Sequence, residues 1–200
     1  MARQGSIIKI NGTIAGINFY KSKDGYLVRE KGGVSAERIK KDPAFQRTRE
    51  NGSEFGRAGT SGKILRNAIR PLLQKASDSR MVSRLTREMI KVIQMDQTSP
   101  RGQRNVIDGE AVLLKGFDFN INGKLGNTLY APQTVEITRT SGLCEVNIPP
   151  FVPTVMIAAP SGTTHFKLLS AAVAVDFENG TFETQTNESG IIAWNDTETQ

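Results

Sequence analysis

The pattern of apolar residues changes near Arg104, and the sign of the charge changes at the same place. Upstream, most apolar residues recur at helical spacing, whereas downstream they fall in short alternating runs separated by Gly and Pro. Residues 1–104 carry 22 Lys and Arg against 9 Asp and Glu, a formal charge of +13. Residues 105–200 carry 4 against 11, a formal charge of −7. The coincidence predicts two modules with these boundaries.

The chain begins with a predicted β-ribbon over residues 6–30. Its short apolar runs are interrupted by Asn11-Gly12 and Asp24-Gly25, two dipeptides typical of tight hairpin turns. A ribbon of two or three strands is only marginally stable in water by itself. We therefore expect it to pack on the helices that follow or on another subunit.

Helices are predicted after this ribbon. The first begins at Asp42-Pro43, where Asp suits the N-cap and Pro suits the first helical position. Four glycines within residues 52–62 are expected to interrupt it, or to let another backbone approach closely. A second helix over residues 63–76 should kink or split at Pro71, because proline removes a backbone donor.

The third predicted helix, residues 79–95, carries the sharpest feature of the basic half. Its apolar residues form one stripe, and basic residues repeat at i, i+4, i+7 and i+11 along another face. We call this second stripe the basic ridge; it consists of Arg80, Arg84, Arg87 and Lys91. Such a ridge suits phosphate groups.

After Arg104 the pattern favours β-structure. Short alternating runs separated by turns with Gly or Pro are typical of an antiparallel sandwich. The expected strands cover residues 112–119, 135–138, 143–148, 164–177 and 181–186. The whole chain is thus predicted to be an α+β protein, with an N-terminal β-ribbon plus basic α-helices and then a C-terminal antiparallel β-sandwich.

The composition argues against catalysis. The chain has one His and one Cys, too few for a zinc cluster of such residues or for a disulfide. Residues 56–64 resemble a phosphate-binding loop, but the glycine spacing is wrong and Ile64 replaces the hydroxyl residue. His165 lies in no recognisable catalytic triad. We therefore expect no enzymatic activity, cofactor, catalytic residue, metal ligand or small-molecule substrate.

The sequence also lacks an apolar run as long as a membrane span or the core of a signal peptide. The lone Cys144 suits a reducing compartment. These features predict no membrane association. They predict a cytoplasmic protein, or one released from the cell within an assembled particle.

Charge asymmetry between halves is typical of nucleic-acid binding or self-association, although two solvated surfaces that merely differ in charge give the same totals. Oppositely charged halves and a marginal ribbon favour head-to-tail contacts, which produce rings or filaments. We expect a non-enzymatic structural protein that forms a homo-oligomer, a filament or a phage-like assembly. The alternative is a nucleic-acid-binding protein that uses the basic half. The residues expected to make either contact are Phe19, Tyr20, Tyr26, Phe45, Arg47, Arg49, Phe55, Arg80, Arg84, Arg87 and Lys91.

Three segments carry a resemblance to a known family: GTIAGINFYK at residues 12–21, DPAFQRTREN at residues 42–51 and EFGRA at residues 54–58. Over roughly residues 1–130 the chain resembles a family of uncharacterised bacterial proteins of the Bacteroidota. That family has no assigned activity, so the resemblance implies none. Its members continue with further strands, which implies that a sandwich formed by this chain keeps an open edge.

Overall fold

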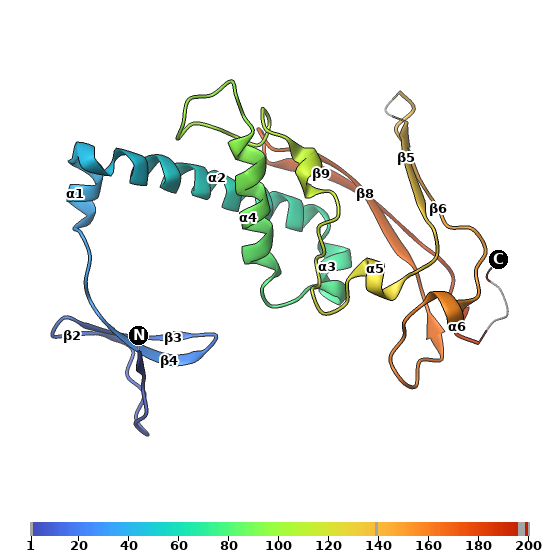
Figure 1. The fold of residues 1–200 in the computed structure, drawn as a ribbon, viewed down its shortest axis with the longest axis horizontal. Helices are drawn as coiled ribbons and strands as arrows, with labels where there is room; N and C mark the ends of the chain where they lie inside the picture. Colours follow the sequence, from blue (N-terminus) through green and yellow to red (C-terminus); the bar gives the residue numbers. More distant parts are fainter. Residues whose placement is uncertain (1, 139, 196–198, 200) are drawn as a thin grey trace. The chain divides into compact units, whose positions relative to one another are not determined.

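The computed structural model describes residues 2–138, 140–195 and 199, and of Lys75 it describes only the backbone. The chain forms two compact units, residues 1–49 and residues 50–200, which we call the N-terminal unit and the C-terminal unit (Figure 1). The boundary predicted near residue 104 falls inside the C-terminal unit. The segment around that residue lies against a helix of the same unit, as described below.

The N-terminal unit is built on a four-stranded antiparallel sheet with the order β1-β4-β3-β2. The strands are β1 (Ala2–Arg3), β2 (Gly12–Ile14), β3 (Ile17–Ser22) and β4 (Gly25–Glu30). A hairpin forms at the predicted place, but its two turn residues are Lys23 and Asp24 and not Asp24 and Gly25, because Ser22 stands opposite Gly25. The other turn lies at Ala15-Gly16 and not at Asn11-Gly12. Both residues of that turn have positive φ, 47° and 81°, as a two-residue turn of type I′ requires.

Two short elements follow the sheet in the N-terminal unit: helix α1 (Ala36–Lys41) and the 3-10 turn η1 (Pro43–Phe45). Asp42 caps the 3-10 turn, as predicted, because its carboxylate accepts a hydrogen bond of 2.9 Å from the backbone N–H of Ala44.

Helix α2 (Gln46–Ala68) runs without a break for 23 residues, so the prediction that its glycines interrupt it is wrong. An added Cβ at Gly62 would lie 3.7 Å from the side chain of Leu85 in helix α4 (Met81–Gln94). Each glycine costs a helix up to about 1 kcal/mol relative to Ala. Packing of α2 against α4 outweighs this cost, because tertiary packing supplies most helical stability in proteins.

The split predicted at Pro71 is confirmed, since α2 ends at Ala68 and helix α3 (Arg70–Ala76) begins with the proline in its first turn. The core of the C-terminal unit is formed mainly by the apolar stripe of α4, which the periodicity predicts correctly. Val82 and Met95 are the exceptions in this stripe, being 45% and 47% exposed. The buried cluster comprises Ala58, Leu73, Met81, Leu85, Met89, Val92, Ile93 and Val106.

Residues 112–119 do not form the predicted strand. They hold the 3-10 turn η2 (Ala111–Leu114) and a loop with Phe117 and Phe119, whose rings pack edge to face at 4.9 Å. Both rings lie against the buried cluster. The apolar alternation in this segment therefore reflects packing on the helices and not strand pairing.

The rest of the C-terminal unit holds short helices and three separate two-stranded antiparallel sheets, paired β5-β6, β8-β9 and β10-β7. The α+β prediction is confirmed, while the described residues form small sheets where larger sandwich sheets were expected. The side-chain hydroxyl of Thr184 ties β9 to the helices by donating a 2.7 Å hydrogen bond to the carbonyl of Ala68. The elements are α5 (Leu125–Thr128), β5 (Thr134–Thr138), β6 (Leu143–Asn147), α6 (Pro153–Met156), β7 (His165–Phe166), β8 (Leu169–Asp176), β9 (Thr181–Glu188) and β10 (Ile192–Ala193).

Candidate functional site

The sheet of the N-terminal unit has two chemically different faces, because side chains alternate along each strand and the register aligns them across strands. One face, which we call the apolar face, carries Ala2, Ile14, Ile17, Phe19 and Val28, with Lys21, Tyr26 and Glu30 at its edge. The opposite face, which we call the basic face, carries Arg3, Thr13, Asn18, Tyr20, Leu27 and Arg29. The sequence-predicted contact residues Phe19 and Tyr20 therefore lie on opposite faces, and Tyr26 lies beside Phe19.

Cations lie over the two tyrosines of this sheet. The guanidinium of Arg29 is 5.5 Å from the ring centre of Tyr20, and the ammonium of Lys21 is 5.7 Å from that of Tyr26. Such cation–π pairs contribute about 0.5–1 kcal/mol each at exposed positions. They fix aromatic and basic groups side by side on each face, which is an arrangement suited to contact with another molecule.

Neither face of the sheet is covered within its own unit. None of residues 2–49 is buried, and Ile14 and Ile17 are 55% and 42% exposed. The apolar side chains of this sheet therefore remain accessible on the N-terminal unit.

The basic ridge of α4 is divided in the structure. Arg84 forms an ion pair with Asp78, donates a 2.7 Å hydrogen bond to the carbonyl of Asp118 and lies 5.2 Å over the ring of Phe117. Its side chain is only 19% exposed. Arg84 is therefore a structural residue of the C-terminal unit and does not present its charge to a partner.

The other members of the ridge are exposed. Arg87 and Lys91 both pair with Glu88, at 3.3 Å and 2.7 Å, and their side chains are 70% and 55% exposed. Their two positive charges share one carboxylate, which leaves a net positive surface here. Arg80 is also exposed at the start of α4.

The remaining predicted contact residues lie on either side of the unit boundary. In the N-terminal unit, Arg49 donates hydrogen bonds of 2.7 Å and 2.9 Å to the carbonyls of Ile39 and Asp42, so it is a structural residue. Arg47 is exposed, and Phe45 is partly covered by the guanidinium of Arg38 at 5.7 Å. In the C-terminal unit, Phe55 is 60% exposed on α2.

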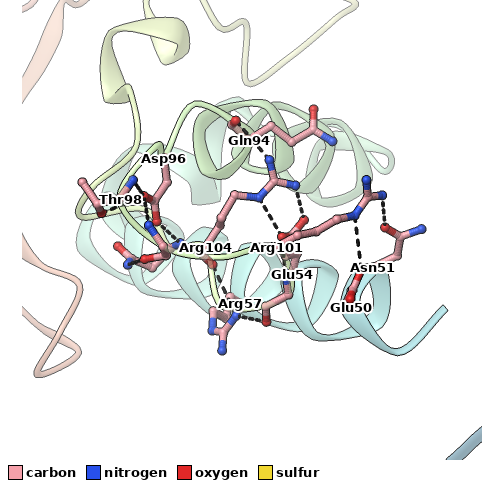
Figure 2. A network of polar contacts seen from close by, with 12 residues as sticks. Glu50, Asn51, Glu54, Arg57, Gln94, Asp96, Thr98, Arg101 and Arg104 are labelled. Atoms are coloured by element: carbon pink, nitrogen blue, oxygen red, sulfur yellow. Dashed lines mark hydrogen bonds and ion pairs between the residues drawn. The ribbon is translucent and has the colours of Figure 1, made fainter. Parts of the chain in front are cut away.

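A network of buried polar contacts, which sequence reasoning missed, holds the loop after α4 against α2 (Figure 2). Arg104 donates to both carboxylate oxygens of Glu54, at 2.7 Å and 2.8 Å, and the Gly102 N–H donates to the same group at 2.7 Å. Arg57 donates a 2.6 Å hydrogen bond back to the Gly102 carbonyl. The Arg104 guanidinium, acting against burial, holds the pKa of Glu54 below its usual range. We call this network, together with the Asp96 turn, the α2 clasp.

The Asp96 turn shapes the same loop. Asp96 is 4% exposed and accepts hydrogen bonds from the N–H groups of Thr98, Ser99 and Asn105, at 2.8–3.0 Å. Burial alone would raise the pKa of Asp96, but these donors hold it well below its ordinary value. The polar segment after residue 95 looks like a linker in the sequence because its partners lie up to 50 residues away. The one local signal is the Asp-x-Thr-Ser turn pattern.

The C-terminal unit has an opening between the β5-β6 and β8-β9 hairpins. It is a groove of about 790 Å³, and its walls include Glu136, Glu145 and Cys144 from the first hairpin. All ten residues of the β5 and β6 strands are exposed. This hairpin thus has no covered face within the described part of the chain.

Chemistry of other kinds finds little support in this geometry. Within the described part of the chain, no three His, Cys, Asp or Glu side chains gather to hold a metal. Among the same residues, no helix combines the length and apolar character of a membrane span.

No protein-family model, no curated protein and no solved structure matches the chain. The resemblance of residues 1–130 to a bacterial family stays a prediction.

Proposed function

We propose that the chain is a non-enzymatic structural protein that associates with copies of itself into an oligomer or filament. The observation that carries this proposal is the N-terminal sheet, whose four strands contain apolar and aromatic side chains although none of residues 2–49 is buried. A cytoplasmic protein, or a particle assembled there and later released, suits the composition.

An uncovered apolar face is unfavourable for the free energy of a small sheet. Ordering the backbone costs about 1–2 kcal/mol per residue, and a small sheet offsets this cost only when an apolar face is covered. Ile14, Ile17, Phe19 and Val28 supply such a face, and no element of their own unit covers it. A second copy of the chain is the simplest cover, because it is always present at the same concentration.

The alternative, nucleic-acid binding, draws on the same exposed cations. Arg80, Arg87, Lys91 and Arg47 remain accessible, but Arg84 and Arg49 are engaged in hydrogen bonds within the protein. Because a ridge without Arg84 has a gap in its centre, it matches the regular spacing of phosphates less well. Self-association depends on none of these cations, and we therefore favour it.

The test is sedimentation velocity of the nuclease-treated protein across a wide concentration range, at low and at moderate salt. We expect the particle size to grow with concentration in the absence of nucleic acid. A protein that stays monomeric throughout overturns the proposal. Salt-sensitive binding of duplex or single-stranded DNA by that monomer supports the alternative instead.

A conservative variant sharpens this test. Ile17→Thr keeps a β-branched residue in the strand and removes apolar surface from the apolar face. We expect it to raise the concentration of half-assembly several-fold. The matched control is Val155→Thr, since Val155 is 67% exposed on α6 of the other unit. Equal assembly of both variants and the wild type would count against the apolar face as an interface.

A further inference from the structure

The groove between the two C-terminal hairpins is acidic on one side. Glu136 and Glu145 stand directly opposite each other in the register of β5 and β6, so both side chains lie on one face, and both line the groove. The β8-β9 side contributes the neutral polar residues Ser170, Gln185 and Asn187. The groove therefore holds two negative charges and no lining cation.

This pair of carboxylates is unfavourable as it stands. Like charges directly opposite each other in an antiparallel pair destabilise a hairpin. Neither Glu136 nor Glu145 forms an ion pair with any residue that the structure describes. A cationic group from outside the unit would remove this repulsion.

The basic face of the N-terminal sheet offers cations of the right kind. Arg3 pairs with Leu27, and Arg29 lies two residues further along the same strand, so the two arginines are diagonal neighbours. Diagonal neighbours such as Arg3 and Arg29 lie about 7–8 Å apart, whereas directly opposite residues such as Glu136 and Glu145 lie about 5 Å apart. Long arginine side chains can span this difference. Among the strand residues of this face there is no acidic side chain. A guanidinium also binds a carboxylate through two parallel hydrogen bonds.

The charges of the two surfaces are complementary on a larger scale as well. Residues 1–49 carry 11 Lys and Arg against 4 Asp and Glu, a formal charge of +7. The C-terminal unit carries 15 against 16, a formal charge of −1, and its acidic excess lies in residues 105–200, which carry −7. An acidic groove repels nucleic acid and attracts a basic protein surface. Each copy of this chain carries both a groove and a strongly basic surface. A second copy is therefore always available as the partner.

We propose that the basic face of the N-terminal sheet of one copy occupies the acidic groove of a second copy, with Arg3 and Arg29 meeting Glu136 and Glu145. The inference rests on the proposed self-association and adds a second contact, on the face of the sheet opposite the apolar face. The two surfaces differ, so the contact is heterologous, and each added copy leaves one sheet and one groove free. Assembly then continues head to tail into a ring or a filament.

The experiment uses two full-length charge-reversal variants that fail on opposite sides of the contact. Glu136→Lys with Glu145→Lys disables the groove and leaves the sheet intact, and Arg3→Glu with Arg29→Glu does the reverse. We expect each variant alone to need at least tenfold more protein for half-assembly than the wild type. Mixed in equal amounts, the two variants should assemble together at concentrations near those of the wild type. The arginine sheet of one variant meets the glutamate groove of the other, and the reversed sheet and the reversed groove are complementary as well.

Matched controls carry the same change of charge elsewhere. Glu178→Lys with Glu183→Lys alters the β8-β9 hairpin outside the residues that line the groove, and Lys40→Glu with Lys41→Glu alters helix α1, away from the sheet strands. Both controls should assemble within a factor of about two of the wild type. Far-UV circular dichroism of every variant at low concentration checks that folding is unchanged.

The sole cysteine gives a second readout, since Cys144 is exposed and lines the groove. We expect its thiol to react at least tenfold more slowly with a maleimide in assembled wild-type protein than in dilute protein. In the mixture of variants, the thiols of both chains should be protected, because the exchanged charges allow both grooves to be occupied.

The outcomes separate the two proposals. A wild-type protein that never assembles overturns self-association and this contact together. Wild-type assembly with both variants assembling equally well overturns the contact and leaves self-association standing. Two monomeric, folded variants whose mixture stays monomeric also overturn the contact, because the exchanged charges of the two variants are complementary.

Discussion

Arg104 binds Glu54 through two parallel hydrogen bonds, of 2.7 Å and 2.8 Å, across 50 residues of sequence. Glu54 is 4% exposed on α2, and Arg104 belongs to the loop that follows α4. The pair therefore links the beginning and the end of the helical part of the C-terminal unit. Its loss should therefore lower the stability of the whole unit.

Glu54→Gln should lower the free energy of unfolding of the C-terminal unit by about 2–3 kcal/mol, because Arg104 would keep a buried position without its counter-charge. Urea unfolding followed by circular dichroism measures the change. Glu178→Gln is the control, since Glu178 is exposed and outside the α2 clasp, and it should change stability by no more than about 0.5 kcal/mol. Equal effects of the two substitutions would contradict the structural importance of the α2 clasp.

Acid should weaken the α2 clasp. The pKa values of Glu54 and Asp96 are lower in the folded protein than the value of about 4 in an unfolded chain. The unfolded state therefore binds more protons as the pH falls, so stability present at neutral pH should be lost between about pH 5 and pH 3. Urea midpoints across this range measure the loss. Glu54→Gln should show a shallower dependence, and an unchanged slope would argue against this assignment.

Gly56 in α2 and Gly109 in the loop after α4 should respond in opposite directions to substitution by alanine. No atom other than its helical neighbours lies near an added Cβ at Gly56, so Gly56→Ala should stabilise α2 by about 0.5–1 kcal/mol. An added Cβ at Gly109 would collide with the backbone carbonyl of Val92, so Gly109→Ala should destabilise by about 2 kcal/mol or more. Thermal unfolding compares them. Loss of assembly in Gly56→Ala would instead reveal another backbone packed on α2.

Arg84 and Arg87 should behave differently although they lie three residues apart on one ridge. Arg84→Ala removes an ion pair, a hydrogen bond to Asp118 and a cation–π contact, and we expect a loss of about 2–3 kcal/mol. Arg87→Ala should cost no more than about 0.5 kcal/mol, because its side chain is 70% exposed. Chemical denaturation of both variants provides the comparison. A larger effect at Arg87 would reverse their assigned roles.

Features that depend on nearby residues were predictable from the sequence. The cap at Asp42, the split near Pro71 and the hairpin near Asp24-Gly25 involve residues only a few positions apart. Their geometry follows from fixed φ angles, absent donors and short side chains that bond to the adjacent backbone. The apolar stripe of α4 was also predictable, because a period of 3.6 residues gives one face without any knowledge of its partner.

Features that depend on distant partners were not predictable from the sequence. Alternation after Arg104 indicated which residues suit strands, but it did not distinguish strand pairing from the packing of Phe117 and Phe119 on the helices. The candidate site divides in the same way. The sequence indicated basic and aromatic residues, whereas the structure separated exposed ones such as Arg87 from Arg84, which is engaged internally.

By itself, then, the sequence determined the α+β class, the basic and acidic halves and the local ends of the helices. The tertiary structure alone decided that α2 stays continuous through its glycines, that the polar segment around Arg104 is held to Glu54, and that the N-terminal sheet has no cover within its unit. The reason is physical. Local preferences are worth about 1 kcal/mol or less per residue, and burial and pairing between distant segments outweigh them.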